Sequence, residues 1–210
     1  MSAGLPPLLV ITDRHQARVP LEEIGAAVIA AGAPWLLFRD KDLDRLRRRR
    51  IAEGLVAAAR AAGARLSVGG DVDLARLVGA DGVHVATLND VVDARTRLGP
   101  GALVGFSAHA VDELGPARTA GADYATLSPI FPSASKPGYG PALGLAALAA
   151  AVPAGLPVYA LGGVGAANAA ACLGAGAAGV AVMGEVMRAA DPAQRVRDVL
   201  RALEKAAGAG

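Results

Sequence analysis

A short apolar run followed by an alanine-rich stretch of helical period recurs about eight times along this chain of 210 residues. The runs are apolar on both faces, which is typical of strands buried in a parallel sheet. They lie at residues 8–12, 35–39, 65–68, 82–85, 103–107, 124–128, 158–161 and 179–182, with helical stretches near 21–31, 43–62, 73–78, 91–98, 111–120, 145–151, 166–174 and 192–206. Open doubly wound sheets usually have about five or six strands. The pattern therefore predicts an α/β fold, a single (β/α)8 TIM barrel, with residues 1–210 as one domain.

Composition excludes several classes of partner. Although 53% of the residues are hydrophobic, no apolar run reaches the roughly 18 residues of a transmembrane helix, so no membrane partner is expected. Aromatic residues make up only 3% of the chain, so the basic block at residues 45–50 is interpreted as a solvated helix face and no nucleic acid is expected. Cys172 is the only cysteine, which predicts a cytoplasmic protein. The alanine-rich helices offer flat faces, and a homodimer is left open.

Two neighbouring strand ends, in residues 157–164 (PVYALGGV) and 178–184 (AGVAVMG), stop at glycine or at Met-Gly before a helix. Such turns point backbone N–H groups at one place and can bind a phosphate without a charged side chain. In a TIM barrel, the loops after the last two strands often hold phosphate. The predicted phosphate cradle consists of Gly162, Gly163, Met183 and Gly184.

Cations follow the second apolar run. Arg39 and Lys41 have the same strand parity, so both side chains could enter one cavity and bind a second anion or a carboxylate. The alternative is a surface ion pair with Asp40 or Asp42. The long loop at residues 128–144 carries Lys136, which could close over a bound phosphate or could simply be solvated.

Histidine supplies the acid–base candidates. His109, two residues after Ser107, is the preferred one because imidazole titrates near neutral pH; helix capping or loop packing is its alternative role. His84 is more consistent with a structural residue at a strand end, and His15 has little support. The sequence shows no Cys/His metal spacing.

The motifs LLVITDR, LLFRDK, ADGVHV, VGFSAH, GADYATLSPIFPSASK and PVYALGGV…GVAVMG, in this order, resemble the thiamine phosphate synthase/TenI family over nearly the whole chain. The resemblance implies a TIM barrel that acts late in thiamine biosynthesis on small phosphorylated substrates. Synthase members join a thiazole phosphate to a pyrimidine methyl pyrophosphate, with Mg²⁺, and release pyrophosphate. TenI-type members instead aromatise a thiazole phosphate carboxylate by moving a proton.

The resemblance assigns roles residue by residue. It implies thiazole-phosphate binding by the glycine cradle and proton transfer by His109. It implies pyrophosphate binding by Arg39, Lys41, Ser107, Ser133, Ser135 and Lys136.

The chain departs from the family where synthases bind Mg²⁺. The first metal-binding Asp position is Gly70, the second is Asn89, and a glutamine near the arginine is replaced by Leu37. Mg²⁺ is usually held by one or two carboxylates beside substrate phosphates. Asp71 and Asp90, each one residue out of register, are the substitutes that could hold it.

Three hypotheses follow. The first is a TenI-like thiazole tautomerase, which needs no metal or cofactor, because a proton shift requires one acid–base group and an anchored phosphate. The second is a thiamine phosphate synthase with Mg²⁺ held in an altered way. The third is a non-catalytic protein that binds a phosphorylated ligand.

Overall fold

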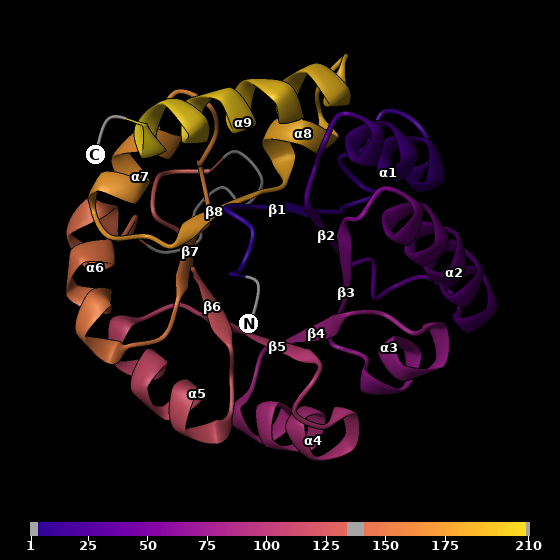
Figure 1. Ribbon diagram of the computed structural model, residues 1–210, viewed down its shortest axis with the longest axis horizontal. Helices are drawn as coiled ribbons and strands as arrows, with labels where there is room; N and C mark the ends of the chain where they lie inside the picture. Colours follow the sequence, from indigo (N-terminus) through magenta and orange to yellow (C-terminus); the bar gives the residue numbers. More distant parts are fainter. Residues whose placement is uncertain (1–3, 134–140, 209–210) are drawn as a thin grey trace.

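The computed structural model describes residues 4–133 and 141–208. Within these ranges, eight parallel strands close into a barrel in chain order, with helices around the outside (Figure 1). The strands are β1 (Leu8–Ile11), β2 (Trp35–Phe38), β3 (Arg65–Gly69), β4 (Gly82–Val85), β5 (Leu103–Ala108), β6 (Tyr124–Leu127), β7 (Val158–Ala160) and β8 (Gly179–Val182). β1 pairs with both β2 and β8, which closes the ring. The predicted TIM barrel is confirmed.

The helical segments follow the strands in alternation. They are α1 (Leu21–Ala30), α2 (Arg45–Ala61), α3 (Val72–Val78), α4 (Leu88–Leu98), η1 (Val111–Glu113), α5 (Leu114–Ala120), α6 (Gly144–Ala151), η2 (Val152–Ala154), α7 (Ala169–Gly174), α8 (Gly184–Met187) and α9 (Pro192–Ala207). Aspartate or threonine side chains cap several N-termini, as in α3, where Asp71 accepts from the backbone N–H of Leu74. No helix in the described part of the chain is long and apolar enough to cross a membrane.

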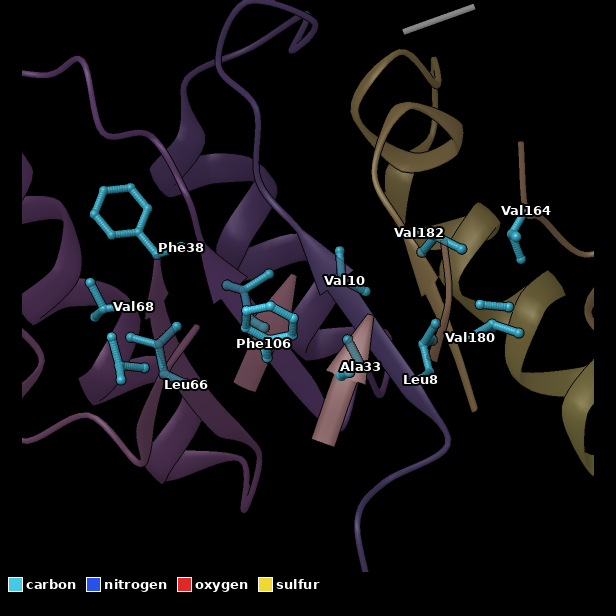
Figure 2. Packing of buried hydrophobic residues seen from close by; sticks show 14 of the residues in the cluster. Leu8, Val10, Ala33, Phe38, Leu66, Val68, Phe106, Val164, Val180 and Val182 are labelled. Atoms are coloured by element: carbon cyan, nitrogen blue, oxygen red, sulfur yellow. The ribbon is translucent and has the colours of Figure 1, made fainter. Parts of the chain in front are cut away.

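The hydrophobic core has two layers because successive strand residues point to opposite faces of the sheet. Leu8 and Val10 of β1 belong to the cluster between the barrel and its helices (Figure 2). Leu9 and Ile11, the alternate residues, belong to the cluster inside the barrel. The strands are therefore apolar on both faces, as their sequences predict.

Three aromatic rings fill the interior of the barrel. Trp35 contacts Tyr124 and Tyr159 edge to face, with ring centroids 4.6 and 5.6 Å away. The indole N–H donates to the hydroxyl of Ser67 at 3.0 Å, so the buried ring has a partner for its polar atom. On the amino-terminal side, the Tyr159 hydroxyl donates to the carbonyl of Pro6. Burial raises the pKa of both tyrosines far above the ordinary value, so both remain neutral.

A candidate active site at the carboxyl end of the barrel

A cavity of about 650 Å³ lies at the carboxyl ends of the strands. Ile11, Leu37 and Ala181 of the inner cluster contribute apolar surface to it. The structure brings the predicted anion-binding and proton-transfer residues that it describes to this one cavity, but not the possible metal ligands Asp71 and Asp90. The predicted residues in the cavity are Arg39, Lys41, Ser107, His109, Ser133, Gly162, Gly163, Met183 and Gly184. Two further predicted residues, Ser135 and Lys136, lie outside the described residues.

The first glycine turn follows β7 and needs glycine for two reasons. Gly162 and Gly163 have φ angles of +91° and +64°, which L side chains rarely adopt. A Cβ at Gly163 would also lie 2.5 Å from the carbonyl oxygen of Pro132. Asn168 holds the turn, since its amide donates to the Gly163 carbonyl at 2.9 Å.

The predicted start of the next helix at residue 166 is wrong. Helix α7 begins only at Ala169, because residues 165–168 form a turn in which the Gly165 N–H donates to the Asn168 side chain at 2.9 Å. The glycine bend is therefore a freestanding turn and is not the first turn of a helix.

The second glycine turn follows β8 and leads into α8, a helix of only four residues. A helix was predicted to follow the Met-Gly turn, but it was placed at residues 192–206, which is α9; α8 is too short to show a helical period. Glu185 and Arg188 of this segment also line the cavity. Both were missed, because their place in the cavity depends on α8.

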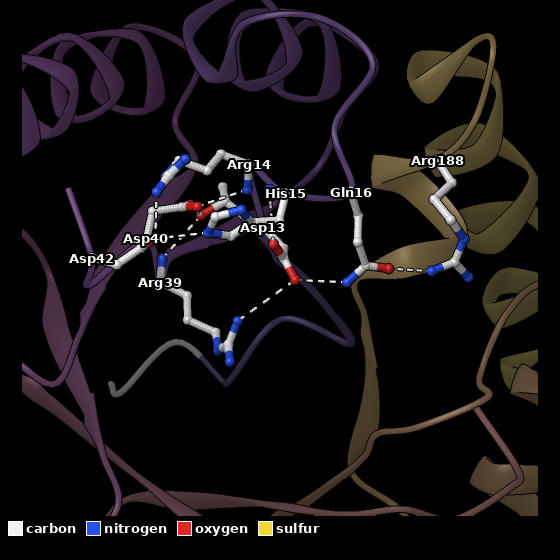
Figure 3. A network of polar contacts seen from close by, with 9 residues as sticks. Asp13, Arg14, His15, Gln16, Arg39, Asp40, Asp42 and Arg188 are labelled. Atoms are coloured by element: carbon white, nitrogen blue, oxygen red, sulfur yellow. Dashed lines mark hydrogen bonds and ion pairs between the residues drawn. The ribbon is translucent and has the colours of Figure 1, made fainter. Parts of the chain in front are cut away.

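A buried polar network fixes the cationic side of the cavity (Figure 3). Asp40, only 4% exposed, accepts from the hydroxyl of Thr12 at 2.6 Å and from the backbone N–H of Arg14 at 2.7 Å. The Thr12 hydroxyl in turn accepts from the Arg39 backbone N–H at 3.0 Å. These bonds join the segments after β1 and β2 and set the backbone from which Arg39 enters the cavity.

The network continues across the mouth of the barrel. Asp13 lies 3.8 Å from the Arg39 guanidinium and accepts from the side chain of Gln16 at 2.6 Å. The Gln16 side chain also accepts from Arg188, beside α8 (Figure 3). The cationic side and the β8 side of the cavity are therefore connected by one ion pair and two hydrogen bonds. No sequence pattern had indicated this connection.

The alternative role predicted for Arg39 and Lys41 was a surface ion pair with Asp40 or Asp42. The structure pairs Asp42 with other residues. Asp42 pairs with Arg14 and with His15, whose Nε2 lies 2.7 Å away. The hydrogen bond from His15, the largest cause, and Arg14 lower the pKa of Asp42. His15 thus belongs to the outer part of the network and is not among the residues that line the cavity.

Lys41 lies close to other cations. Burial, followed by the charges of Arg39 and Arg48, lowers the pKa of Lys41, while Asp90 acts in the opposite direction. Arg48, part of the basic block interpreted as a solvated face, is in fact 8% exposed and reaches inward to the carbonyl of Gly69 at 2.8 Å. This side of the cavity is suited to an anion.

The two cavity histidines differ in what their ring nitrogens contact. Nδ1 of His109 lies 3.0 Å from the carbonyl oxygen of Ser128, a pure acceptor, so the Nδ1–H donates to it. His84 lies within reach of the Tyr124 hydroxyl and, through Nε2, of the Thr126 hydroxyl. Burial, with a smaller contribution from Lys41, lowers the pKa of His84 to about 3. His84 is therefore a neutral structural residue, whereas His109 is the cavity histidine without such burial.

The carboxylates near this end do not fit a Mg²⁺ site. Asp71 uses one oxygen to accept from Arg48 at 2.6 Å and the other to cap α3 at Leu74. Asp90 is exposed in the first turn of α4. Among residues 4–133 and 141–208, no three His, Cys, Asp or Glu side chains form a group that could hold a metal ion. Neither Asp71 nor Asp90 is therefore positioned to replace the Mg²⁺-binding aspartates of the synthases.

A closed (β/α)8 barrel with a cavity at the carboxyl ends of its strands defines the class of TIM-barrel proteins. The comparisons with known proteins then give the family. The sequence profile of the thiamine monophosphate synthase (TMP-TENI) family matches residues 8–186. This chain belongs to that enzyme family.

Individual relatives agree with this assignment. A putative thiamine-phosphate synthase from Geobacter sulfurreducens is 38% identical over 93% of each chain. The thiamine-phosphate synthase of Chromobacterium violaceum is 41% identical over 92% of this chain and 96% of that one. Among solved structures, the thiamine phosphate pyrophosphorylase of Pyrococcus furiosus has a TM-score of 0.84 at 28% identity, covering 95% of this chain and 96% of the other.

Proposed function

We propose that this enzyme is a thiamine phosphate synthase, which joins a thiazole phosphate to a pyrimidine methyl pyrophosphate. In this reaction the thiazole nitrogen forms a bond to the pyrimidine methylene carbon. The bond from that carbon to the pyrophosphate oxygen breaks, and pyrophosphate leaves with the bonding electrons. The products are thiamine phosphate and pyrophosphate, so atoms and charge balance.

The observation that carries this proposal is that one cavity has two different walls, each of a kind that suits an anion. The glycine turns at Gly163 and Gly184 suit one phosphate through backbone amides. Arg39 and Lys41, after β2, suit a second and more highly charged group. A proton shift on one phosphorylated thiazole needs only one such wall plus a carboxylate contact, whereas coupling two phosphorylated molecules needs both.

The names of the relatives support the same choice. The proteins about 40% identical over most of this chain are called thiamine-phosphate synthases. The tautomerase, which the sequence favoured, therefore becomes the second candidate.

In the proposed reaction, the chain's own residues bind, orient and stabilise charge. The glycine turns hold the thiazole phosphate, and the apolar floor around Leu37 and Ala181 excludes water from the rings. Arg39 and Lys41 stabilise the negative charge that develops on the departing pyrophosphate.

The test is turnover by the purified protein. With thiazole phosphate and pyrimidine methyl pyrophosphate, we expect thiamine phosphate and pyrophosphate in equal amounts, measured by chromatography. Arg39→Ala should lower kcat/KM by about 10²-fold or more, since the charge it meets is largest in the transition state. Arg50→Ala, which removes an exposed cation from α2, is the matched control and should be unchanged. Absence of product under saturating substrates would contradict the proposal.

One observation favours thiazole tautomerase as a second candidate. His109 lines the cavity and its Nδ1–H donates to the Ser128 carbonyl, so proton transfer would fall to Nε2. If the carboxylated thiazole phosphate tautomer is the true substrate, the wild type should aromatise it, and His109→Gln should reduce that rate by about 10²–10⁴-fold. A protein that binds thiazole phosphate but converts neither substrate would instead be the non-catalytic binder.

A further inference from the structure

The turn after β3 presents backbone, and no carboxylate, to the cavity. Gly69 lines the cavity, and Gly70 has a φ angle of +64° with its N–H donating to the carbonyl of His84 at 2.8 Å. The next residue, Asp71, is turned away into its contacts with Arg48 and with the N-terminus of α3. This stretch therefore has no side-chain oxygen to offer a metal ion.

The side chain of Lys41 lies over Gly70. A Cβ built on Gly70 would lie 2.5 Å from Nζ and 2.6 Å from Cε of Lys41. The ammonium group thus occupies the space in which any side chain at position 70 would begin. A side chain at position 70 would therefore have to displace the end of the Lys41 side chain.

The charges around the ammonium group oppose a further cation. Burial, the largest cause, and the charges of Arg39 and Arg48 lower the pKa of Lys41, and the charge of Asp90 acts in the opposite direction. Arg48 is balanced by its contact with Asp71 at 2.6 Å. A divalent cation placed here would meet like charges, whereas an oxyanion would relieve their repulsion.

We infer that this end of the cavity binds its oxyanion directly, through the Lys41 ammonium lying over Gly70 and the Arg39 guanidinium, with no divalent cation between protein and anion. The inference rests on the proposed function for the identity of the oxyanion, a pyrophosphate group. It replaces the Mg²⁺ that the family resemblance implies with two side-chain cations of this chain.

The direct test is calorimetric titration of the full-length protein with inorganic pyrophosphate, once in EDTA and once in excess Mg²⁺. We expect binding in EDTA to be at least as tight as binding in Mg²⁺. Mg²⁺ would neutralise part of the negative charge of pyrophosphate, to which Lys41 and Arg39 are attracted. Binding that appears only with Mg²⁺, or that is about tenfold tighter with it, would overturn the inference. So would failure to bind pyrophosphate in both buffers.

Variants show whether Lys41 carries this binding. Lys41→Ala should weaken pyrophosphate binding in EDTA by about 10- to 100-fold, the usual range for a hydrogen bond to a charged group. Arg50→Ala, an exposed cation on α2, should change it by less than about twofold. Circular dichroism and thermal unfolding of both variants verify that they fold. An unchanged affinity in folded Lys41→Ala would contradict the inference.

A matched pair at position 70 separates charge from size. Asp and Asn have nearly the same shape, and both tolerate positive φ better than most residues. Gly70→Asp should weaken pyrophosphate binding in EDTA about tenfold more than Gly70→Asn, because only the carboxylate pairs with Lys41 and repels the ligand. Equal losses in the two variants would show that the charge of Lys41 is not what binds the anion.

These outcomes are separate from those of the proposed function. EDTA-resistant pyrophosphate binding that depends on Lys41, in a protein that forms no thiamine phosphate, would refute the synthase and leave the metal-free anion site. Formation of thiamine phosphate with strictly Mg²⁺-dependent pyrophosphate binding would support the synthase and refute the metal-free site.

Discussion

The two walls of the cavity offer different groups to a ligand. On the β7–β8 side, they are backbone groups, and after β7 the turn is formed by Gly162 and Gly163 at φ angles that other residues rarely adopt. On the β2–β3 side, they are the flexible, charged side chains of Arg39 and Lys41, and a buried network around Thr12 and Asp40 fixes the backbone beneath them. The first wall should therefore be sensitive to changes in shape and the second to changes in charge.

The largest effect is expected from Gly163→Ala. The new Cβ would lie 2.5 Å from the Pro132 carbonyl oxygen at a φ angle of +64°, so the turn must move. We expect about a 100-fold loss of affinity for thiazole phosphate, measured by calorimetry, and a loss of about 1–3 kcal/mol in the free energy of unfolding. Pyrophosphate affinity on the opposite wall should stay within about threefold of wild type.

Gly54→Ala is the control for that change. Gly54 lies in α2, and no atom lies within 4 Å of a Cβ built on it. This variant should bind both ligands normally and be slightly more stable, because alanine favours helix over glycine. If Gly163→Ala behaved like Gly54→Ala, the amide wall would not depend on its backbone conformation.

Thr12→Val tests the network under the cationic wall. The substitution keeps the shape but removes the hydroxyl that donates to Asp40 and accepts from the Arg39 backbone. Because Asp40 is buried, we expect a loss of about 1–3 kcal/mol in the free energy of unfolding, measured with urea. Thr119→Val, at an exposed site on α5, should cost less than about 0.5 kcal/mol. Similar losses in both variants would show that the hydrogen bonds of the Thr12 hydroxyl do not stabilise the fold.

Arg39→Ala should change binding in the opposite pattern to Gly163→Ala. Removing one cation next to Lys41 should weaken pyrophosphate binding about tenfold and leave thiazole phosphate binding within about twofold. Titrating both variants with both ligands gives four affinities. A loss of both ligands in either variant, with folding intact, would mean that the two walls are not independent.

The smallest effect concerns pH and the buried His84 between the two walls. Its pKa is lowered to about 3 in the folded protein, against about 6.5 when unfolded. Between these values the unfolded state binds a proton that the folded state does not, so stability is lost as pH falls through this window. From about pH 7.5 to about pH 5.5, the wild type should lose about 1 kcal/mol more than His84→Gln in urea unfolding. Equal losses would show that His84 is protonated in the folded protein.

The sequence was sufficient for the fold and for much of the cavity. Strand parity predicted that Arg39 and Lys41 enter one cavity, and glycine at the ends of β7 and β8 predicted the two turns. These features depend on local spacing, which the chain displays directly. The approximate strand positions could be assigned for the same reason.

Other features could not be predicted because they depend on contacts between distant residues. The bond between Gln16 and Arg188 joins residues 172 positions apart. The inward turn of Arg48 toward Gly69 distinguishes it from the other residues of a basic block that looked uniform. Helix α8 is too short to show a period, and the turn before α7 depends on the side-chain bonds of Asn168.

The most direct test of the two-wall account is a crystal structure of the protein soaked with thiazole phosphate and pyrophosphate together. We predict both ligands in the one cavity, with phosphate oxygens within hydrogen-bond distance of the Gly163 or Gly184 amide and pyrophosphate oxygens on Arg39 and Lys41. The account would be contradicted if either ligand excluded the other, or if the thiazole phosphate lay on the cations with the glycine amides facing elsewhere.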